Sequence, residues 1–175
     1  MKIQPLWDYR GQKRPDFAIA PVEGQESVWD YPRPPRIVSD RRRVYVRSPG
    51  VLIASTTAAF RILETASPPT FYLPAVDVDL VKLVRVPGNS ACEWKGLAGY
   101  WALAGDNSRR VVGWSYENPP VEFAMIAGAL SFYPEMVDCT VDGERVRPQP
   151  GGFYGGWVTD EIVGPVKGGP QTGHW

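Results

Sequence analysis

Histidine and cysteine are scarce in this chain of 175 residues, which contains one histidine and two cysteines. The histidine, His174, is the penultimate residue, so histidine-based zinc sites and iron facial triads are excluded. Cys92 and Cys139 stand 47 positions apart, which fits neither paired Cys-x-x-Cys motifs nor a disulfide framework. We therefore expect no bound metal and no other cofactor.

The chain also has a formal net charge of zero at pH 7, since 19 basic side chains balance 19 acidic ones. A neutral chain lacks the basic face used to bind nucleic acid, and the run Arg41-Arg42-Arg43 is shorter than the basic patches typical of that function. No run of about 18 apolar residues is present, and the first residues lack the apolar region of a secretory signal. We expect a cytoplasmic protein with neither nucleic acid nor membrane as a partner.

Glycine and proline are abundant instead, with 18 of each. Residues 1–40 combine prolines with tryptophans and tyrosines and show no helical or strand period, which indicates an irregular N-terminal arm. Residues 147–175 are Gly-rich and also carry aromatic residues, so a C-terminal arm is expected there. Residues 41–146 would form a single core domain between them. The arms would pack on their own domain or close a homodimer.

Short runs of alternating or β-branched apolar residues fill the central segment and predict strands. Two hairpins are clearest, 43–47 with 51–54 and 97–104 with 110–116, because a short Gly-containing turn joins each pair. Further strands are expected at 70–73, 79–86, 129–133 and 136–141.

Two short helices are expected among these strands. Ser55, Thr56 or Thr57 would cap a helix over 58–64, and Pro119-Pro120 would open another over 121–127. The sequence thus predicts a mainly β domain with two short helices and irregular terminal arms.

Several short motifs occur together in this chain. They are Arg61-Ile62-Leu63-Glu64-Thr65, Pro68-Pro69, Phe71-Tyr72-Leu73-Pro74, Cys92-Glu93-Trp94-Lys95-Gly96, Tyr100-Trp101, Trp114-Ser115-Tyr116, Ala127-Gly128 and Phe132-Tyr133. This set resembles the bacterial family called domain of unknown function 427, over about residues 41–146, in its longer form with extensions at both ends. The resemblance implies a β-tent-like (Mss4-like) fold. It also carries a nucleotidyltransferase-like label, but it implies no settled activity.

The turn Cys92-Glu93-Trp94-Lys95-Gly96 precedes an expected strand, where side chains reach the mouth of a pocket. The positive charge of Lys95 favours the thiolate of Cys92, which is the nucleophilic form. Glu64 would end the first helix, where the helix dipole disfavours a carboxylate, so we expect Lys95 to pair with it. Cys92, Lys95 and Glu64 are the candidate catalytic residues. The alternative is structural, with Cys92 in the core and Glu64 and Lys95 as an ordinary ion pair.

Aromatic residues on or beside the expected strands are the candidates for ligand binding. Alternate residues of a strand share a face, so several of these rings would line the concave side of the sheet and offer hydroxyl groups to a ligand. The alternative is that they are ordinary core residues. The candidates are Tyr72, Trp94, Tyr100, Trp114 and Tyr116.

Three functions fit the sequence. The first is a pocket protein that binds, and in one version transforms, a small molecule through these residues. The second is a nucleotidyl- or phosphoryl-transfer enzyme in which Asp77 and Asp79 hold magnesium. The third is a non-catalytic scaffold module whose arms pack on a partner. The pocket protein accounts for the largest number of motifs, and whether it is an enzyme stays open.

Overall fold

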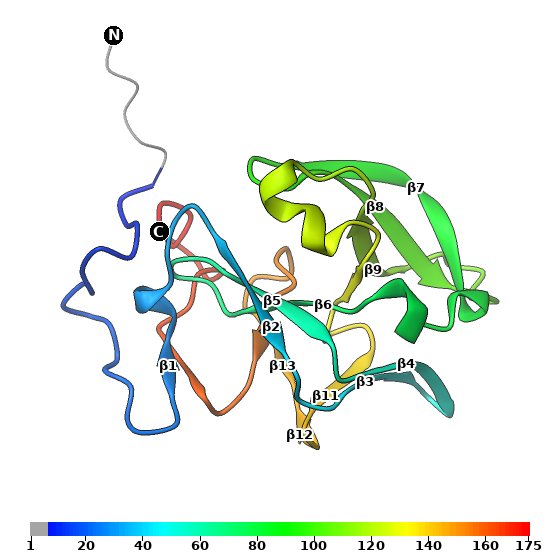
Figure 1. The fold of residues 1–175 in the computed structure, drawn as a ribbon, viewed down its shortest axis with the longest axis horizontal. Coiled ribbons are helices and arrows are strands. Elements are labelled where there is room, and N and C mark those ends of the chain that lie inside the picture. Colours follow the sequence, from blue (N-terminus) through cyan, green and yellow to red (C-terminus); the bar gives the residue numbers. More distant parts are fainter. Residues whose placement is uncertain (1–6) are drawn as a thin grey trace, which may run out of the picture.

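The computed structural model describes residues 7–175 as a mainly β structure, which confirms the expected fold class (Figure 1). Residues 1–6 of the expected N-terminal arm lie outside the described residues. The strands are β1 (Glu26–Ser27), β2 (Arg36–Asp40), β3 (Val44–Ser48), β4 (Val51–Thr56), β5 (Ala59–Leu63), β6 (Thr70–Tyr72), β7 (Leu83–Cys92), β8 (Gly96–Leu103), β9 (Val111–Tyr116), β10 (Leu130–Phe132), β11 (Asp138–Val141), β12 (Glu144–Arg145), β13 (Arg147–Pro148), β14 (Trp157–Val158) and β15 (Ile162–Val163). The helices of this part of the chain are the 3-10 segments η1 (Val28–Asp30), η2 (Ala75–Asp77), η3 (Leu80–Lys82) and η4 (Val121–Ile126). None of them has the length and hydropathy needed to cross a membrane.

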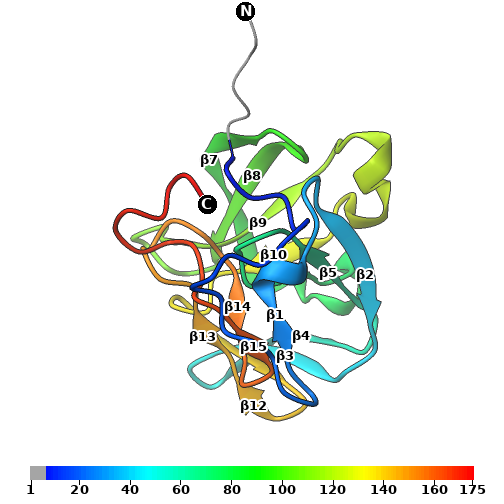
Figure 2. The same cartoon turned by 90° about the vertical axis from the view of Figure 1, so that its left-hand side faces the viewer.

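Two four-stranded antiparallel sheets form the two ends of the domain, as Figures 1 and 2 both show. One has the strand order β10-β9-β8-β7 and the other β12-β11-β3-β4. The sheet β2-β5-β6 lies between them, and Leu73, just after β6, pairs with Leu130 of β10 through backbone hydrogen bonds of 2.7 and 2.9 Å. This link joins the middle sheet to the first one. Both expected hairpins are confirmed, as β3–β4 and β8–β9.

The helix expected over 58–64 is wrong, because this segment forms strand β5. Its backbone pairs with β2 on one edge and with β6 on the other, whereas a helix this short would carry the full cost of nucleation. Thr56 does not cap a helix; it accepts a hydrogen bond of 2.9 Å from the N–H of Ala58 and donates one of 2.6 Å to Asp77. The second expected helix is confirmed as η4, which follows Pro120.

Strand β7 begins later and runs further than the sequence predicts. Residues 80–82 form η3, and the strand then continues to Cys92 past Pro87 and Gly88. A register shift between Val86 and Asn89 accommodates these two residues. Because β7 pairs with β8 as far as Cys92 and Gly96, the turn between them lies at one end of the sheet.

Both terminal segments pack on the domain of their own chain. Trp157 is fully buried in the main core, stacks on Phe71 with ring centroids 4.7 Å apart, and donates a 2.9 Å hydrogen bond to the carbonyl of Phe132. Trp29 anchors the N-terminal segment and packs edge-on against Trp175, with the two ring centroids 5.2 Å apart. The two segments also meet directly, since β1 pairs in parallel with β15.

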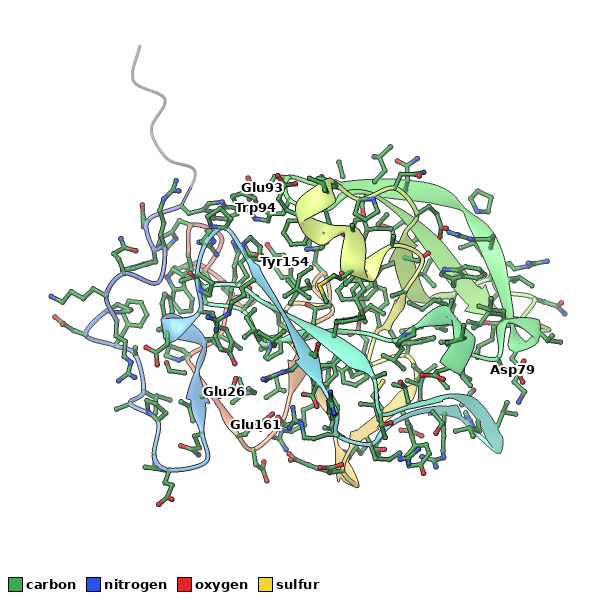
Figure 3. The ribbon with its side chains drawn as sticks, viewed as in Figure 1. Glu26, Asp79, Glu93, Trp94, Tyr154 and Glu161 are labelled. Atoms are coloured by element: carbon green, nitrogen blue, oxygen red, sulfur yellow. The ribbon has the colours of Figure 1, made fainter. Side chains whose placement is uncertain are left out.

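A partly buried ionic network, centred on the buried Asp40, holds these segments to the middle sheet. Arg42 binds Asp40 and Glu161, each at 2.6 Å, and Arg61 binds Glu26 at 3.1 Å and Asp40 at 3.2 Å. Figure 3 shows Glu26 and Glu161, from the two terminal segments, close to each other. Burial, the largest single influence, raises the pKa values of Asp40 and Glu26, but hydrogen bonds and the nearby positive charges of Arg42 and Arg61 together outweigh it and lower both.

Replacing Trp157 with alanine should destabilise the protein by about 3–5 kcal/mol, because it removes a buried indole and leaves a cavity. The control is Phe153→Ala, since that ring is 74% exposed, and it should change stability by about 0.5 kcal/mol or less. Urea unfolding measures both values. Equal, small losses would contradict the placement of the C-terminal segment in the core.

Acid should weaken the ionic network. Because the folded-state pKa values of Asp40 and Glu26 are lowered, their stabilisation is complete above the unfolded values of about 4 and is lost as the pH falls through the folded values. Asp40→Asn should lower the free energy of unfolding by roughly 1.5–3 kcal/mol at pH 7. The difference in this free energy from wild type should shrink toward pH 3. Thermal unfolding from pH 7 to 3 tests this against Asp16→Asn, at an exposed position. A difference in stability between Asp40→Asn and wild type that stays constant from pH 7 to 3 would contradict this role of the network.

Candidate functional site

A cavity of about 370 Å³ lies between the β7–β10 sheet, the β5–β6 part of the middle sheet and the C-terminal segment. All the candidate residues chosen from the sequence line it, although they come from five separate places in the chain. They are Glu64, Tyr72, Cys92, Trp94, Lys95, Tyr100, Trp114 and Tyr116. The structure therefore brings the candidate catalytic and ligand-binding residues into one site.

The pairing of β8 with β9 places the aromatic wall of the cavity. Tyr100 pairs with Trp114, and Ala98 pairs with Tyr116, so these four side chains share one face of the sheet. Ala98 is small and leaves space beside the Tyr116 ring, which lies 6.3 Å from the ring of Tyr72. The fit of large rings around one small residue keeps the cavity open.

Phenol groups form the deepest part of this wall. The hydroxyl of Tyr72 accepts a 3.2 Å hydrogen bond from Nε1 of Trp114. Burial raises the pKa values of Tyr72 and Tyr116 far above their ordinary range, and burial raises that of Tyr133 to about 12. These phenols are protonated at neutral pH, as ordinary tyrosines are, and the three residues line the cavity.

The expected ion pair between Glu64 and Lys95 is wrong. Glu64 accepts a 3.1 Å hydrogen bond from Nε of the buried Arg33, because it follows strand β5 and lies against the N-terminal segment. The ammonium of Lys95 makes no hydrogen bond or ion pair with any of residues 7–175, and it lies 5.7 Å from the centroid of the Tyr116 ring. Both side chains line the cavity separately.

Cys92 ends β7 as a half-buried, unbridged thiol at the cavity. Cys139 is buried on β11, outside the cavity lining, and burial raises its pKa well above the ordinary value. The structure thus separates the two cysteines by environment. The role of Cys92 as a nucleophile stays a prediction.

The N-terminal segment covers the cavity with Trp7, which the sequence analysis missed. Its Nε1 donates a 2.9 Å hydrogen bond to Glu93 in the β7–β8 turn. Its ring lies 3.8 Å from the ammonium of Lys167 and 4.6 Å from the guanidinium of Arg33. Burial, and then the nearby charge of Arg33, lower the pKa of Lys167 to about 8. No sequence signal gives such contacts, because irregular segments have no period.

The C-terminal segment supplies the other missed residues, among them Phe153 and Tyr154. Figure 3 shows Tyr154 on the same side of the molecule as Glu93 and Trp94. Between them and the core, Gly155 passes directly over Trp114, and a Cβ atom there would come within 2.0 Å of the indole ring. The Gly-rich composition of this segment therefore permits a close covering of the cavity.

The two aspartates considered for magnesium lie elsewhere. Asp77 accepts a 2.6 Å hydrogen bond from Thr56, and Asp79 forms a 2.8 Å ion pair with Lys82. Neither lines the cavity, and Figure 3 shows Asp79 far from Glu93. Within the described part of the chain, no three His, Cys, Asp or Glu side chains gather as a metal-binding group.

Fold and site together define a mainly β domain whose aromatic-lined cavity is covered by its own terminal segments. The chain belongs to the family described as a domain of unknown function (DUF427), labelled NTP_transf_9, whose model matches residues 36–143. This match confirms the resemblance seen in the motifs, and it begins at β2. No curated protein matches the chain. The β-tent-like arrangement that the resemblance implies stays a prediction.

Thiol titration should distinguish the two cysteines. Cys92 should react with the disulfide reagent DTNB in the native protein because it is only half buried, whereas the buried Cys139 should react only after denaturation. Cys92→Ser should abolish the native reaction, and Cys139→Ser should leave it unchanged. Native labelling of Cys139 would contradict the assigned environments.

Proposed function

We propose that the protein binds a small organic molecule in this cavity, with the Cys92–Gly96 turn supplying polar contacts and the strand aromatics supplying the apolar wall. The volume of about 370 Å³ supports this, because ligand pockets span roughly 300–1,000 Å³. The lining supports it as well, since aromatic surface with a few convergent polar groups is typical of such pockets.

The observation that carries the proposal is that large aromatic rings face this space instead of filling it. Protein interiors are packed to near-crystalline density, so core aromatics normally contact other side chains on all sides. Here Trp94, Tyr100 and Tyr133 are only half buried, and each lines the same cavity. A ligand inserted among them would remove apolar surface from water at roughly 25 cal/mol per Å².

The covering by both terminal segments favours binding over a scaffold role. Trp7 and Tyr154 lie on the cavity of their own chain, so the aromatic content of the arms is explained without a second copy.

The placement of Asp77 and Asp79 outside the cavity favours binding over magnesium-dependent transfer. Of the candidate catalytic residues, Cys92 and Lys95 are open to the ligand, while Glu64 is held by Arg33. The two unbridged cysteines support a reducing, cytoplasmic location.

The uncharged fluorescent probe N-phenyl-1-naphthylamine tests the proposal. It should bind the native protein saturably, with a rise in fluorescence. Ser90→Trp should weaken binding by about tenfold or more, because Ser90 lines the cavity from β7 and a bulky ring there occupies the space.

Asn89→Trp is the matched control. Asn89 is the preceding residue of the same strand, is exposed and does not line the cavity, so probe affinity should be unchanged. Thermal unfolding verifies that both variants fold. Absence of probe binding to the native protein, or equal affinities for the two variants, would refute the proposal.

A further inference from the structure

The charged side chains that line the cavity differ in the partners that the protein itself gives them. Two carboxylates line it, and each already has a donor: Glu64 accepts from Arg33 at 3.1 Å, and Glu93 accepts from Trp7 at 2.9 Å. Glu64 is thereby paired with a cation, whereas Glu93 is an exposed residue that accepts from a neutral N–H and forms no ion pair within residues 7–175.

One of the two ammonium groups is satisfied as well. Lys167 donates a 3.1 Å hydrogen bond to the main-chain oxygen of Trp175, and its ammonium lies 3.8 Å from the ring of Trp7. It is held between the two terminal segments, where it helps to fix the covering of the cavity.

Lys95 is the exception. The residue is only 9% exposed, and its ammonium makes no hydrogen bond or ion pair within residues 7–175. The ammonium keeps access to the solvent in the cavity that the residue lines, and no carboxylate of residues 7–175 forms an ion pair with it. An anion in the cavity would supply the missing partner.

The neighbouring residue has the same requirement. Nε1 of Trp94 is buried and has no acceptor within the described chain. Trp94 and Lys95 are adjacent in the β7–β8 turn, and both line the cavity. The turn thus presents to the cavity a positive charge that has no protein partner, and such a group favours oxygen atoms that bear negative charge.

We propose, building on the proposed function, that the ligand is a flat aromatic organic monoanion. Its carboxylate or sulfonate group pairs with Lys95, and its ring packs against Tyr100 and Trp114. A single unpaired ammonium fits a single charge. Nucleoside triphosphates need several cationic groups or a metal for their phosphates, so they do not match this site.

A pair of probes with the same rings isolates the charge. 8-Anilino-1-naphthalenesulfonate carries a sulfonate on the ring system of N-phenyl-1-naphthylamine. The native protein should bind the sulfonate about 10–100-fold more tightly than the uncharged probe, as expected for a charge-assisted hydrogen bond. Fluorescence titration gives both affinities.

Substitution of Lys95 then tests the residue. Lys95→Met keeps a similar chain length without the charge, so it should abolish the preference for the sulfonate, measured as the ratio of the two probe affinities in the same variant. Lys95→Arg should keep most of the preference. Lys13→Met, at an exposed position, controls for net charge and should change neither affinity.

The outcomes separate this inference from the proposed function. Equal binding of the two probes to the native protein, or a sulfonate preference that survives Lys95→Met, overturns the anionic ligand while the cavity remains a binding site. Failure of the uncharged probe to bind overturns the proposed function itself. A preference lost in Lys95→Met and kept in Lys95→Arg and Lys13→Met supports the assignment.

Discussion

The register between β8 and β9 is the constraint on which the site depends. It sets Tyr100 opposite Trp114 on the cavity face, while Trp101 lies on the other face and donates a 3.0 Å hydrogen bond to Ser115. A slip of one residue would exchange the two faces and remove the cavity wall. The polar contact between Trp101 and Ser115 therefore helps to fix the aromatic lining on the opposite side of the same sheet.

The terminal segments complete what the sheets begin. Trp157 anchors the C-terminal segment in the main core, and the ionic network around Asp40 holds both segments to the middle sheet. From these anchors, short irregular stretches reach over the cavity, where Gly155 lies against Trp114. In the C-terminal segment, the buried Trp157 thus anchors the chain, while Gly155 permits the close approach by which Phe153 and Tyr154 cover the cavity.

Much of the site follows from the sequence because strand alternation has a simple period. The paired hairpin 97–116 places Tyr100, Trp114 and Tyr116 together, and the turn at Cys92 lies at its edge. The helix expected over 58–64 failed because capping residues and a partial apolar face do not reveal that two neighbouring strands offer their edges. The predicted pairing of Glu64 with Lys95 failed for the same reason, because it assumed that Glu64 ends a helix.

Contacts made by the irregular segments lie beyond such reasoning. Trp7 contacts Arg33, which is 26 positions away, and Lys167, which is 160 positions away, and no local pattern marks either of them as its neighbour. Aromatic composition predicts that these segments are anchored, but the position of each contact depends on the completed fold.

The parallel pairing of β1 with β15 has a consequence for biosynthesis. Glu26 meets Ile162, and Ser27 meets Val163, so β1 finds its partner only after more than a hundred further residues have been made. The β10-β9-β8-β7 sheet can form earlier, because its strands are consecutive in sequence. During synthesis, the aromatic wall of the cavity therefore exists before the segment around Tyr154 that covers it.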